Sequence, residues 1–315
     1  MRFLTPLRRF VTRLAYRRRF NGAWSKRLAT LDVWPFEFGS QSKEGGPMLP
    51  GLTQPITAAS TIGDAVIRKY RTIADLANRA AAKVELGPDR VTISVDGITA
   101  VAYGEADIQV FHEIFVERIY QFELPGPFHF VDAGANIGLA SLFFARQYGG
   151  RVTAYELVPS TVEIAKENIA LNPELAGMID VAAAGWSDAA GSFEIAFDSS
   201  RRTSNSLLDE SQNGKGPVER VSVLDAADEF QRLLNTTGDT PIVLKLDIEG
   251  AEYVVLRRLA EARLLQKCKV LFIEWHRVPG HDPEEIREIL RQEGYHWFED
   301  QHGLVDVGMI RAFRS

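Results

Sequence analysis

Cysteine is nearly absent from this sequence: Cys268 is the only one in 315 residues. A single cysteine excludes an internal disulfide and a metal site built from several cysteines, and it favours a reducing, cytoplasmic setting. Long hydrophobic runs are missing as well, since no stretch approaches the roughly 18 apolar residues of a membrane-spanning helix. The hydrophobic content of 45% and the charged content of 25% are those of an ordinary globular protein.

Acidic residues are absent from the first 31 positions, which carry nine arginines and lysines. Since the whole chain has 36 basic and 42 acidic residues, the remainder holds 27 basic and 42 acidic ones. Two interpretations of residues 1–27 stay open: a basic helix packed against the acidic remainder, or an interfacial helix in peripheral contact with anionic lipid at the inner membrane surface. A nucleic-acid partner is not expected, because phosphates require a cationic surface.

Three domains are expected along the chain. Residues 1–63 form the basic segment and an irregular linker rich in glycine, proline, serine and threonine. Residues 64–127 combine helical periodicity with alternating strands around Asp96-Gly97, a strong hairpin signal, and predict an α+β extension that serves as a substrate cap. Residues 128–315 form the main domain.

From Phe128 onward, apolar strands alternate with helical patterns. Asp282-Pro283 is a strong helix start, and the segments 296–300 and 305–313 predict a closing pair of strands. Repeated βα units with apolar strands predict an α/β fold with a Rossmann-like, doubly wound and mostly parallel sheet. Ligands in such sheets bind beyond the carboxyl ends of the strands.

The stretch VDAGANIG, residues 131–138, lies where the first of these strands turns into a helix. Gly134 permits close approach of the backbone to a ligand, and Gly138 permits close packing of helix on strand. The dinucleotide fingerprint is incomplete, and the Asp132 carboxylate would repel a pyrophosphate but attract an ammonium group. Glu156, at the end of the next strand, suits the two hydroxyls of a ribose. Together these features indicate S-adenosyl-L-methionine; a plain tight turn is the alternative.

Three carboxylates crowd the end of another apolar strand in LKLDIEGAE, residues 244–252. Glu252 is expected simply to start a helix, where acids are favoured by the free N–H groups. Asp247, with His276 beyond the following strand, is a candidate general base, and Glu249 is undecided between catalysis and helix start. Lys245 is expected to pair with one of the acids. No metal site is expected, since the spacing matches no dedicated metal motif.

The motifs VDAGANIG, AYE, LKLDIEGAE and FIEWH together resemble the FkbM-type family of S-adenosylmethionine-dependent methyltransferases, over roughly residues 90–300. The resemblance implies a class I methyltransferase fold, and it places the segment 221–228 in a linker before the fourth strand. It also places Trp186 beside the cofactor, and core packing is the alternative role for this residue. The resemblance assigns seven residues to the cofactor: Asp132, Gly134, Asn136 and Gly138 at the methionine end, Glu156 at the ribose, and Trp186 and Ser187 beside the adenine.

The resemblance further implies O-methylation of a hydroxyl on a sugar, a glycan or a natural-product intermediate. The candidate catalytic residues are His276, Asp247 and Glu249, and His276 is preferred over Asp247 as the base. The competing hypothesis is a cofactor-binding but non-catalytic scaffold protein, which engages anionic lipid or a partner through its basic N-terminal helix. The identity of the small-molecule or glycan acceptor is not encoded in any motif.

Overall fold

The computed structural model describes residues 24, 28, 46–49, 51–57, 60–123, 126–196, 217–300 and 306–314. The basic segment lies almost wholly outside them, so its two interpretations stay predictions. The chain divides into two compact units, Met1–Ile119 and Tyr120–Ser315, whereas the sequence placed the boundary after residue 127. No helix in the described part of the chain is long and apolar enough to cross a bilayer.

The first unit combines a three-stranded antiparallel sheet, in the order β1-β2-β3, with short helices. The predicted hairpin between β2 and β3 is confirmed: Asp96 and Gly97 have positive φ values of 51° and 76°. Whether this unit acts as a cap stays a prediction. Its described elements are α3 (Gly63–Arg68), α4 (Tyr70–Arg79), β1 (Lys83–Leu86), β2 (Val91–Val95), β3 (Ile98–Ala102), α5 (Glu105–His112) and a π-helix (Glu113–Glu117).

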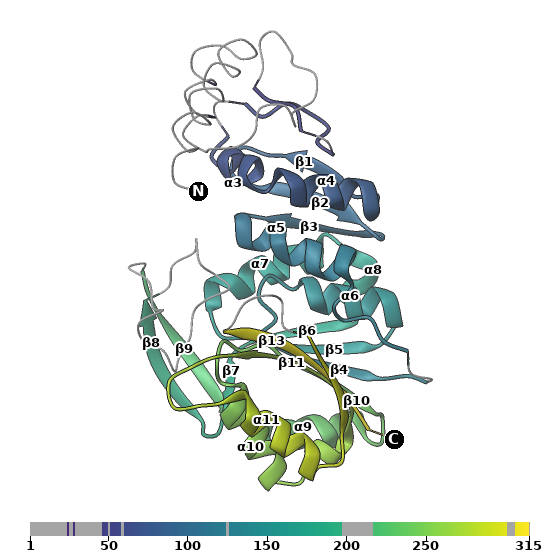
Figure 1. Ribbon diagram of the computed structural model, residues 1–315, viewed down its shortest axis with the longest axis vertical. Helices are drawn as coiled ribbons and strands as arrows, with labels where there is room; N and C mark the ends of the chain where they lie inside the picture. Colours follow the sequence, from purple (N-terminus) through teal and green to yellow (C-terminus); the bar gives the residue numbers. More distant parts are fainter. Residues whose placement is uncertain are drawn as a thin grey trace, which may run out of the picture. The chain divides into compact units, whose positions relative to one another are not determined.

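The second unit is built on a seven-stranded sheet in the order β12-β13-β11-β10-β4-β5-β6 (Figure 1). In the described part of this sheet, β13 runs antiparallel to both of its neighbours and the other strands are parallel. The Rossmann-like, mostly parallel sheet predicted from the sequence is therefore confirmed. Its strands are β4 (His129–Ala133), β5 (Arg151–Glu156), β6 (Ile179–Ala183), β10 (Ile242–Leu246), β11 (Cys268–His276), β12 (His296–Asp300) and β13 (Val307–Phe313).

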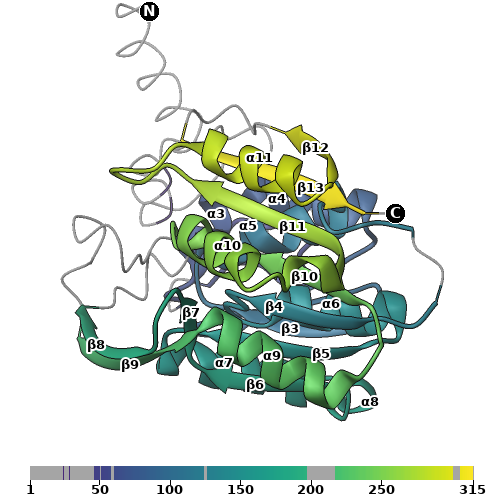
Figure 2. The same ribbon diagram turned by 90° about the horizontal axis from the view of Figure 1, so that it is seen from below.

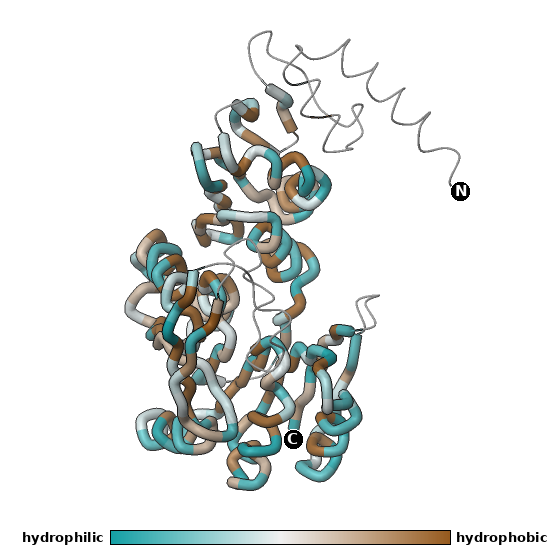
Figure 3. The backbone as a smooth tube through the Cα atoms, turned by 90° about the vertical axis from the view of Figure 1, so that its left-hand side faces the viewer, coloured by the Kyte–Doolittle hydropathy of each residue, from teal (hydrophilic) through white to brown (hydrophobic). Residues whose placement is uncertain are grey.

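Helices cover both faces of this sheet, with α6, α7 and α8 on one side and α9, α10 and α11 on the other (Figures 1 and 2). All five residues of β10 are buried, which explains why its sequence is apolar apart from Lys245 and does not alternate. Hydrophobic and hydrophilic residues are interspersed along the helices, as suits helices with one buried face (Figure 3). The helices are α6 (Leu139–Tyr148), α7 (Pro159–Ala170), α8 (Pro173–Ala176), α9 (Ala226–Thr237), α10 (Glu252–Glu261), α11 (Pro283–Gln292) and a 3₁₀ turn (Leu265–Lys267).

The start of α11 is as predicted. The Asp282 side chain accepts from the backbone N–H of Glu284, and Glu285 reaches back to the backbone of Asp282, which completes a capping box.

The expectation of a linker over residues 221–228 is wrong. A second small sheet, in the order β7-β9-β8, contains β7 (Gly185–Ser187), β8 (Gly191–Ala196) and β9 (Val218–Asp225). Val221 and Val223 alternate inward from β9, and Asp225 then caps α9 by accepting from two backbone N–H groups. The segment is thus a strand followed directly by a helix, because its alternating valines pair with β8 and its aspartate ends the strand.

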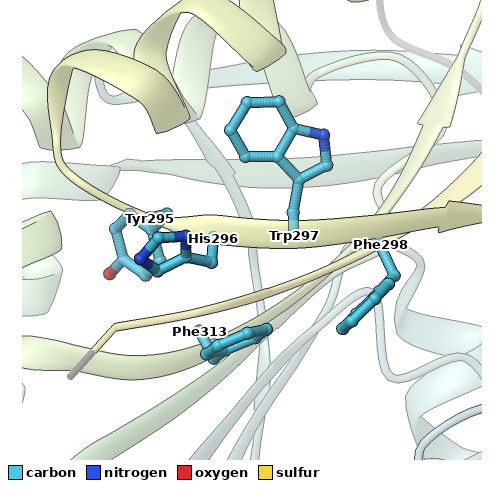
Figure 4. Close-up of a pocket in the computed structure, with 5 residues that line it drawn as sticks. All are labelled: Tyr295, His296, Trp297, Phe298 and Phe313. Atoms are coloured by element: carbon cyan, nitrogen blue, oxygen red, sulfur yellow. The ribbon is translucent and has the colours of Figure 1, made fainter.

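An aromatic pocket lies at the edge of the large sheet, on β12 (Figure 4). Trp297 projects from the opposite side of the strand to Phe298, as the alternation of a strand requires. The pocket is lined by Tyr295, His296, Trp297, Phe298 and Phe313. None of the residues predicted to bind the cofactor or to act in catalysis lines this pocket.

Candidate active site

The strand order reverses at the boundary between β4 and β10. Going outward, β4 is followed by the strands that come next in the chain, β5 and β6, whereas β10 and β11 lie on its other side. Ligands of doubly wound sheets bind at such a point. The glycine loop after Ala133 and the turn after Leu246 both begin here, since these two residues pair across the strands.

Gly134 allows these two loops to touch. A side-chain Cβ at this position would lie 1.7 Å from the carbonyl oxygen of Asp247, and its φ of +85° is also unfavourable for other residues. Gly134 was predicted to allow close approach to a ligand. In the structure, the group that approaches it closely is the backbone carbonyl of Asp247. Gly138 lies against helix α7, where a Cβ would be 3.3 Å from the Cβ of Ala165, so its close contact is with a helix and not the predicted one of helix on strand.

Lys245, on β10, contacts both the glycine loop and the turn after β10. Its buried ammonium lies 3.1 Å from Asp132 Oδ1 and 3.3 Å from Asp247 Oδ2, and it donates to the carbonyl oxygen of Gly134 at 2.9 Å. Burial alone would lower the pKa of Lys245, but the two carboxylates outweigh burial and raise the pKa above its ordinary value. The lysine therefore stays charged, and it pairs with two acids where the sequence indicated one.

Asp132 is fully buried, and Ser141 donates to its Oδ2 at 2.6 Å. With Lys245 on its other oxygen, the carboxylate is neutralised inside the protein. In this geometry Asp132 shapes the glycine loop, and its predicted role at the methionine end of the cofactor stays a prediction.

Glu156 holds the glycine loop from the neighbouring strand. Its Oε2 accepts from the backbone N–H of Asn136 at 2.8 Å, and its Oε1 accepts from that of Val158 at 2.9 Å. Burial raises the pKa of Glu156, although both hydrogen bonds oppose the shift. Each carboxylate oxygen has a further lone pair, so two ribose hydroxyls still match this group.

Asn136 supplies an acceptor that the described protein does not use. Its Oδ1 is buried and has no hydrogen-bond partner among the described residues. A buried polar atom without a partner is costly, so a donor from a ligand would stabilise it. An ammonium or a ribose hydroxyl of S-adenosylmethionine is such a donor, and the loop around Asn136 and Glu156 therefore fits this cofactor.

Trp186 and Ser187 both lie on β7. The Trp186 ring is buried in the core, 5.0 Å from the ring of Tyr155 and 6.3 Å from that of Phe230. Its Nε1 is a buried donor without a partner among the described residues. Ser187 donates to Asp188 at 3.1 Å. The core-packing role of Trp186 is therefore real, and the adenine contacts of both residues stay predictions.

The three candidate catalytic residues come together at the ends of β10 and β11. His276 Nε2 lies 3.5 Å from Glu249 Oε2, and one ligand atom each of Asp247, Glu249 and His276 lies within 4.8 Å of the others. A cation would fit between these atoms, but such groupings also occur without one. The expectation of no metal stays a prediction.

Glu252 does more than start a helix, which is the role predicted for it from the sequence. It does lie in the first turn of α10, but its carboxylate is fully buried, and Oε1 lies 3.2 Å from His276 Nδ1. The same carboxylate accepts from the backbone N–H groups of Ile248 at 2.8 Å and Gly250 at 2.9 Å. In the sequence, only the two-residue spacing between Gly250 and Glu252 pointed to this contact. That spacing does not tell whether the acid is buried or solvated.

The carboxylates around His276 determine its protonation. Burial alone would lower the pKa of His276, but Glu252, Glu249 and Asp247 outweigh it and hold the pKa well above its ordinary value. Burial raises the pKa of Glu249 to about 9, with the imidazole opposing and the neighbouring acids adding to the shift. Both shifts favour the protonated form of the group concerned, and His276 and Glu249 form a coupled pair.

The known proteins that this chain resembles are methyltransferases. The chain matches a family model described as "Methyltransferase FkbM domain" over residues 132–297, more than half of its length. It is 27% identical over 247 residues to "Methyltransferase sdnD" of Sordaria araneosa, which covers 68% of this chain and 94% of the relative. It is 26% identical over 170 residues to "Methyltransferase 1" of Beauveria bassiana, covering 49% of this chain and 68% of the relative.

Among solved structures, the chain is similar to an S-adenosylmethionine-dependent methyltransferase from Agrobacterium tumefaciens, with 16% identity, coverage of 73% and 71%, and a TM-score of 0.44. It is also similar to a human methyltransferase 10 domain containing protein, with 12% identity, coverage of 76% and 90%, and a TM-score of 0.38. The family match and the sheet define a class I methyltransferase with S-adenosyl-L-methionine as its cofactor. The chain belongs to the FkbM methyltransferase family.

Proposed function

We propose that this methyltransferase methylates a hydroxyl group of a small-molecule or glycan acceptor. The observation that carries the proposal is the His276 cluster at the carboxyl ends of β10 and β11, beside the glycine loop. A hydroxyl must lose its proton during methylation, and a histidine backed by a carboxylate is suited to accept it. The alternative of a non-catalytic scaffold protein is not favoured by membership of a methyltransferase family.

The residues of the glycine loop and of Glu156 would hold the cofactor. S-adenosylmethionine, when bound, supplies an electrophilic methyl group on sulfur. The lone pairs of Glu156 would orient the ribose, and the unpartnered Oδ1 of Asn136 would accept from the ammonium or a hydroxyl. Lys245 keeps the loops of β4 and β10 together, so that the cofactor and the base are held in one geometry.

His276 acts as the general base in this proposal. The cofactor, when bound, would supply the methyl group to the acceptor oxygen, and His276 Nε2 would take the hydroxyl proton. Only the neutral imidazole can take this proton. Asp247 is the competing base: its side chain is 27% exposed and lies beside the same turn, but Lys245 already occupies one of its oxygens.

Calorimetric titration with S-adenosylmethionine, followed by transfer of a labelled methyl group to a panel of sugars, glycosides and hydroxylated small molecules, tests the function. We expect binding, and a methyl ether as the product. Absence of binding would overturn the cofactor assignment. A methylated nitrogen or carbon in the product would leave the cofactor in place but reject O-methylation.

A further inference from the structure

Glu252 occupies a position that the role of a helix-start acid does not explain. An acid in the first turn of a helix is normally solvated, as Glu284 in α11 is: it is 58% exposed and pairs with Arg287 and Arg291. Glu252 is instead 0% exposed, and its carboxylate bonds to groups that precede its helix or lie on β11. A buried charge persists only when it is fully engaged, which indicates a specific task.

The first part of this task is to hold the turn after β10. Glu249 has a φ of +54° and Gly250 a φ of +105°, so the turn contains a non-glycine residue in the left-handed region. Such residues persist where the surroundings fix them. Here the Glu252 carboxylate binds the N–H groups of Ile248 and Gly250, which flank Glu249 on both sides. The carboxylate thereby fixes where Glu249 lies relative to His276.

The second part of the task concerns the imidazole itself. Because the Glu252 carboxylate is an acceptor, the nitrogen beside it, Nδ1, must carry a hydrogen in both protonation states. The neutral ring then has its lone pair on Nε2, the nitrogen that faces Glu249. Tyr253 donates to the backbone carbonyl of His276 at 2.9 Å and fixes the strand end from the same helix.

We propose that Glu252 is a positioning residue for methyl transfer: it holds His276 in the tautomer with the proton on Nδ1 and closes the turn that brings Glu249 to Nε2 and Asp247 close to the same imidazole. This inference rests on the proposed function, in which His276 is the base. It assigns to one buried carboxylate the arrangement of all three candidate catalytic side chains.

Charged groups surround the imidazole from several elements. Glu252 comes from α10, and Asp247 and Glu249 come from the turn after β10. Glu274 on β11 and Lys245 on β10 act on the same cluster, and Arg277, paired with Asp306, follows His276 in the chain. Among the causes that raise the pKa of His276, the charge of Glu252 is the largest. Removal of that charge should therefore be visible in the titration of this one histidine.

The test is nitrogen-15 NMR of histidine-labelled, full-length protein, which reports the tautomer and titration of His276 without any acceptor. The test variant is Glu252→Gln. The matched control is Glu285→Gln, which alters a second pair of histidine and glutamate on the chain, since His281 Nδ1 lies 3.3 Å from Glu285. A His276→Gln variant assigns the signal. We expect the wild-type neutral ring to carry its proton on Nδ1. We expect Glu252→Gln to lower the titration midpoint of His276 by about one pH unit, a tenfold loss of proton affinity, and Glu285→Gln to leave it unchanged.

A wild-type His276 with its neutral proton on Nε2 would overturn the proposal without any variant, so a misfolded Glu252→Gln protein does not leave it untested. An unchanged midpoint in a folded Glu252→Gln protein would also overturn it. Calorimetry with S-adenosylmethionine on the same samples distinguishes failure of the proposed function from failure of the role of Glu252. Absence of cofactor binding to the wild type rejects the proposed function, whereas an unshifted titration of His276 rejects only the role of Glu252. With an acceptor from the hydroxyl panel, Glu252→Gln should lower kcat more than it raises the KM for the cofactor.

Discussion

Lys245 is the residue on which the electrostatics of the site depend, because it is the buried cation between two carboxylates. Replacement by methionine would leave the fully buried Asp132 without its counter-charge. Breaking a buried pair in this way costs about 3–5 kcal/mol of unfolding free energy. We expect Lys245→Met to lose that amount in urea denaturation, and Lys245→Met with Asp132→Asn to recover much of it. A double variant no more stable than the single one would contradict this account.

His276 and Asp247 predict different pH profiles, which decides between them as base. The pKa of His276 is raised by its carboxylates, so its neutral form is populated only as pH rises through a value above 6.5. By linkage, the stability that the imidazolium contributes is present below pH about 6.5 and is lost as pH rises through the raised pKa. With His276 as the base, the rate of methyl transfer should therefore rise over the same pH range in which this contribution to the free energy of unfolding is lost.

The measurement is kcat against pH, with His276→Asn and Asp247→Asn beside the wild type. We expect an acidic limb above pH 6.5 that disappears in His276→Asn, with a loss of roughly 10²–10⁴-fold in rate at high pH. A wild-type rate that is flat from pH 5.5 to 8.5 would instead assign the base to Asp247.

The prediction that no metal ion binds at this cluster can be tested directly. His276 lies within 3.5 Å of both Glu249 and Glu252, and Lys245 pairs with Asp247, so we predict that these side chains hold the cluster without a divalent cation. We expect prolonged dialysis against a chelator to leave methyl transfer unchanged, as judged before and after addition of Mg²⁺ or Mn²⁺. Activity that is lost on dialysis and restored by one of these ions would make the three residues metal ligands.

At the scale of the elements, the contact between the loops of β4 and β10 depends on Gly134. Gly134→Ala adds a Cβ that collides with the Asp247 carbonyl and also strains a positive φ, so it should cost at least about 2 kcal/mol of unfolding free energy. Gly149→Ala is the matched control: Gly149 also has a positive φ, +66°, but a Cβ there meets nothing within 4 Å. Equal losses for the two variants, measured by thermal unfolding, would show that strain alone matters.

The elements most readable from the sequence were those encoded by neighbouring residues. The Asp96-Gly97 hairpin and the helix start at Asp282-Pro283 depend on local backbone chemistry, and both were predicted. The strand β9 was taken for a linker, since its alternating valines become a strand only by pairing with β8. Glu252 was misjudged for the same physical reason: whether a carboxylate at a helix start is solvated depends on His276, 24 residues away in the chain.

At the scale of the whole molecule, every residue assigned to the cofactor lies in the unit 120–315. A ligand that binds only the folded state stabilises it by RT ln(1 + [L]/Kd), about 2.7 kcal/mol at a concentration of 100 Kd. Calorimetric unfolding should therefore shift to higher temperature with S-adenosylmethionine. Where the two units unfold in separate transitions, only that of 120–315 should move, because the other unit holds none of these residues. NAD is the control, since the glycine loop lacks the dinucleotide fingerprint and Asp132 disfavours a pyrophosphate; an equal shift with NAD would reject the cofactor assignment.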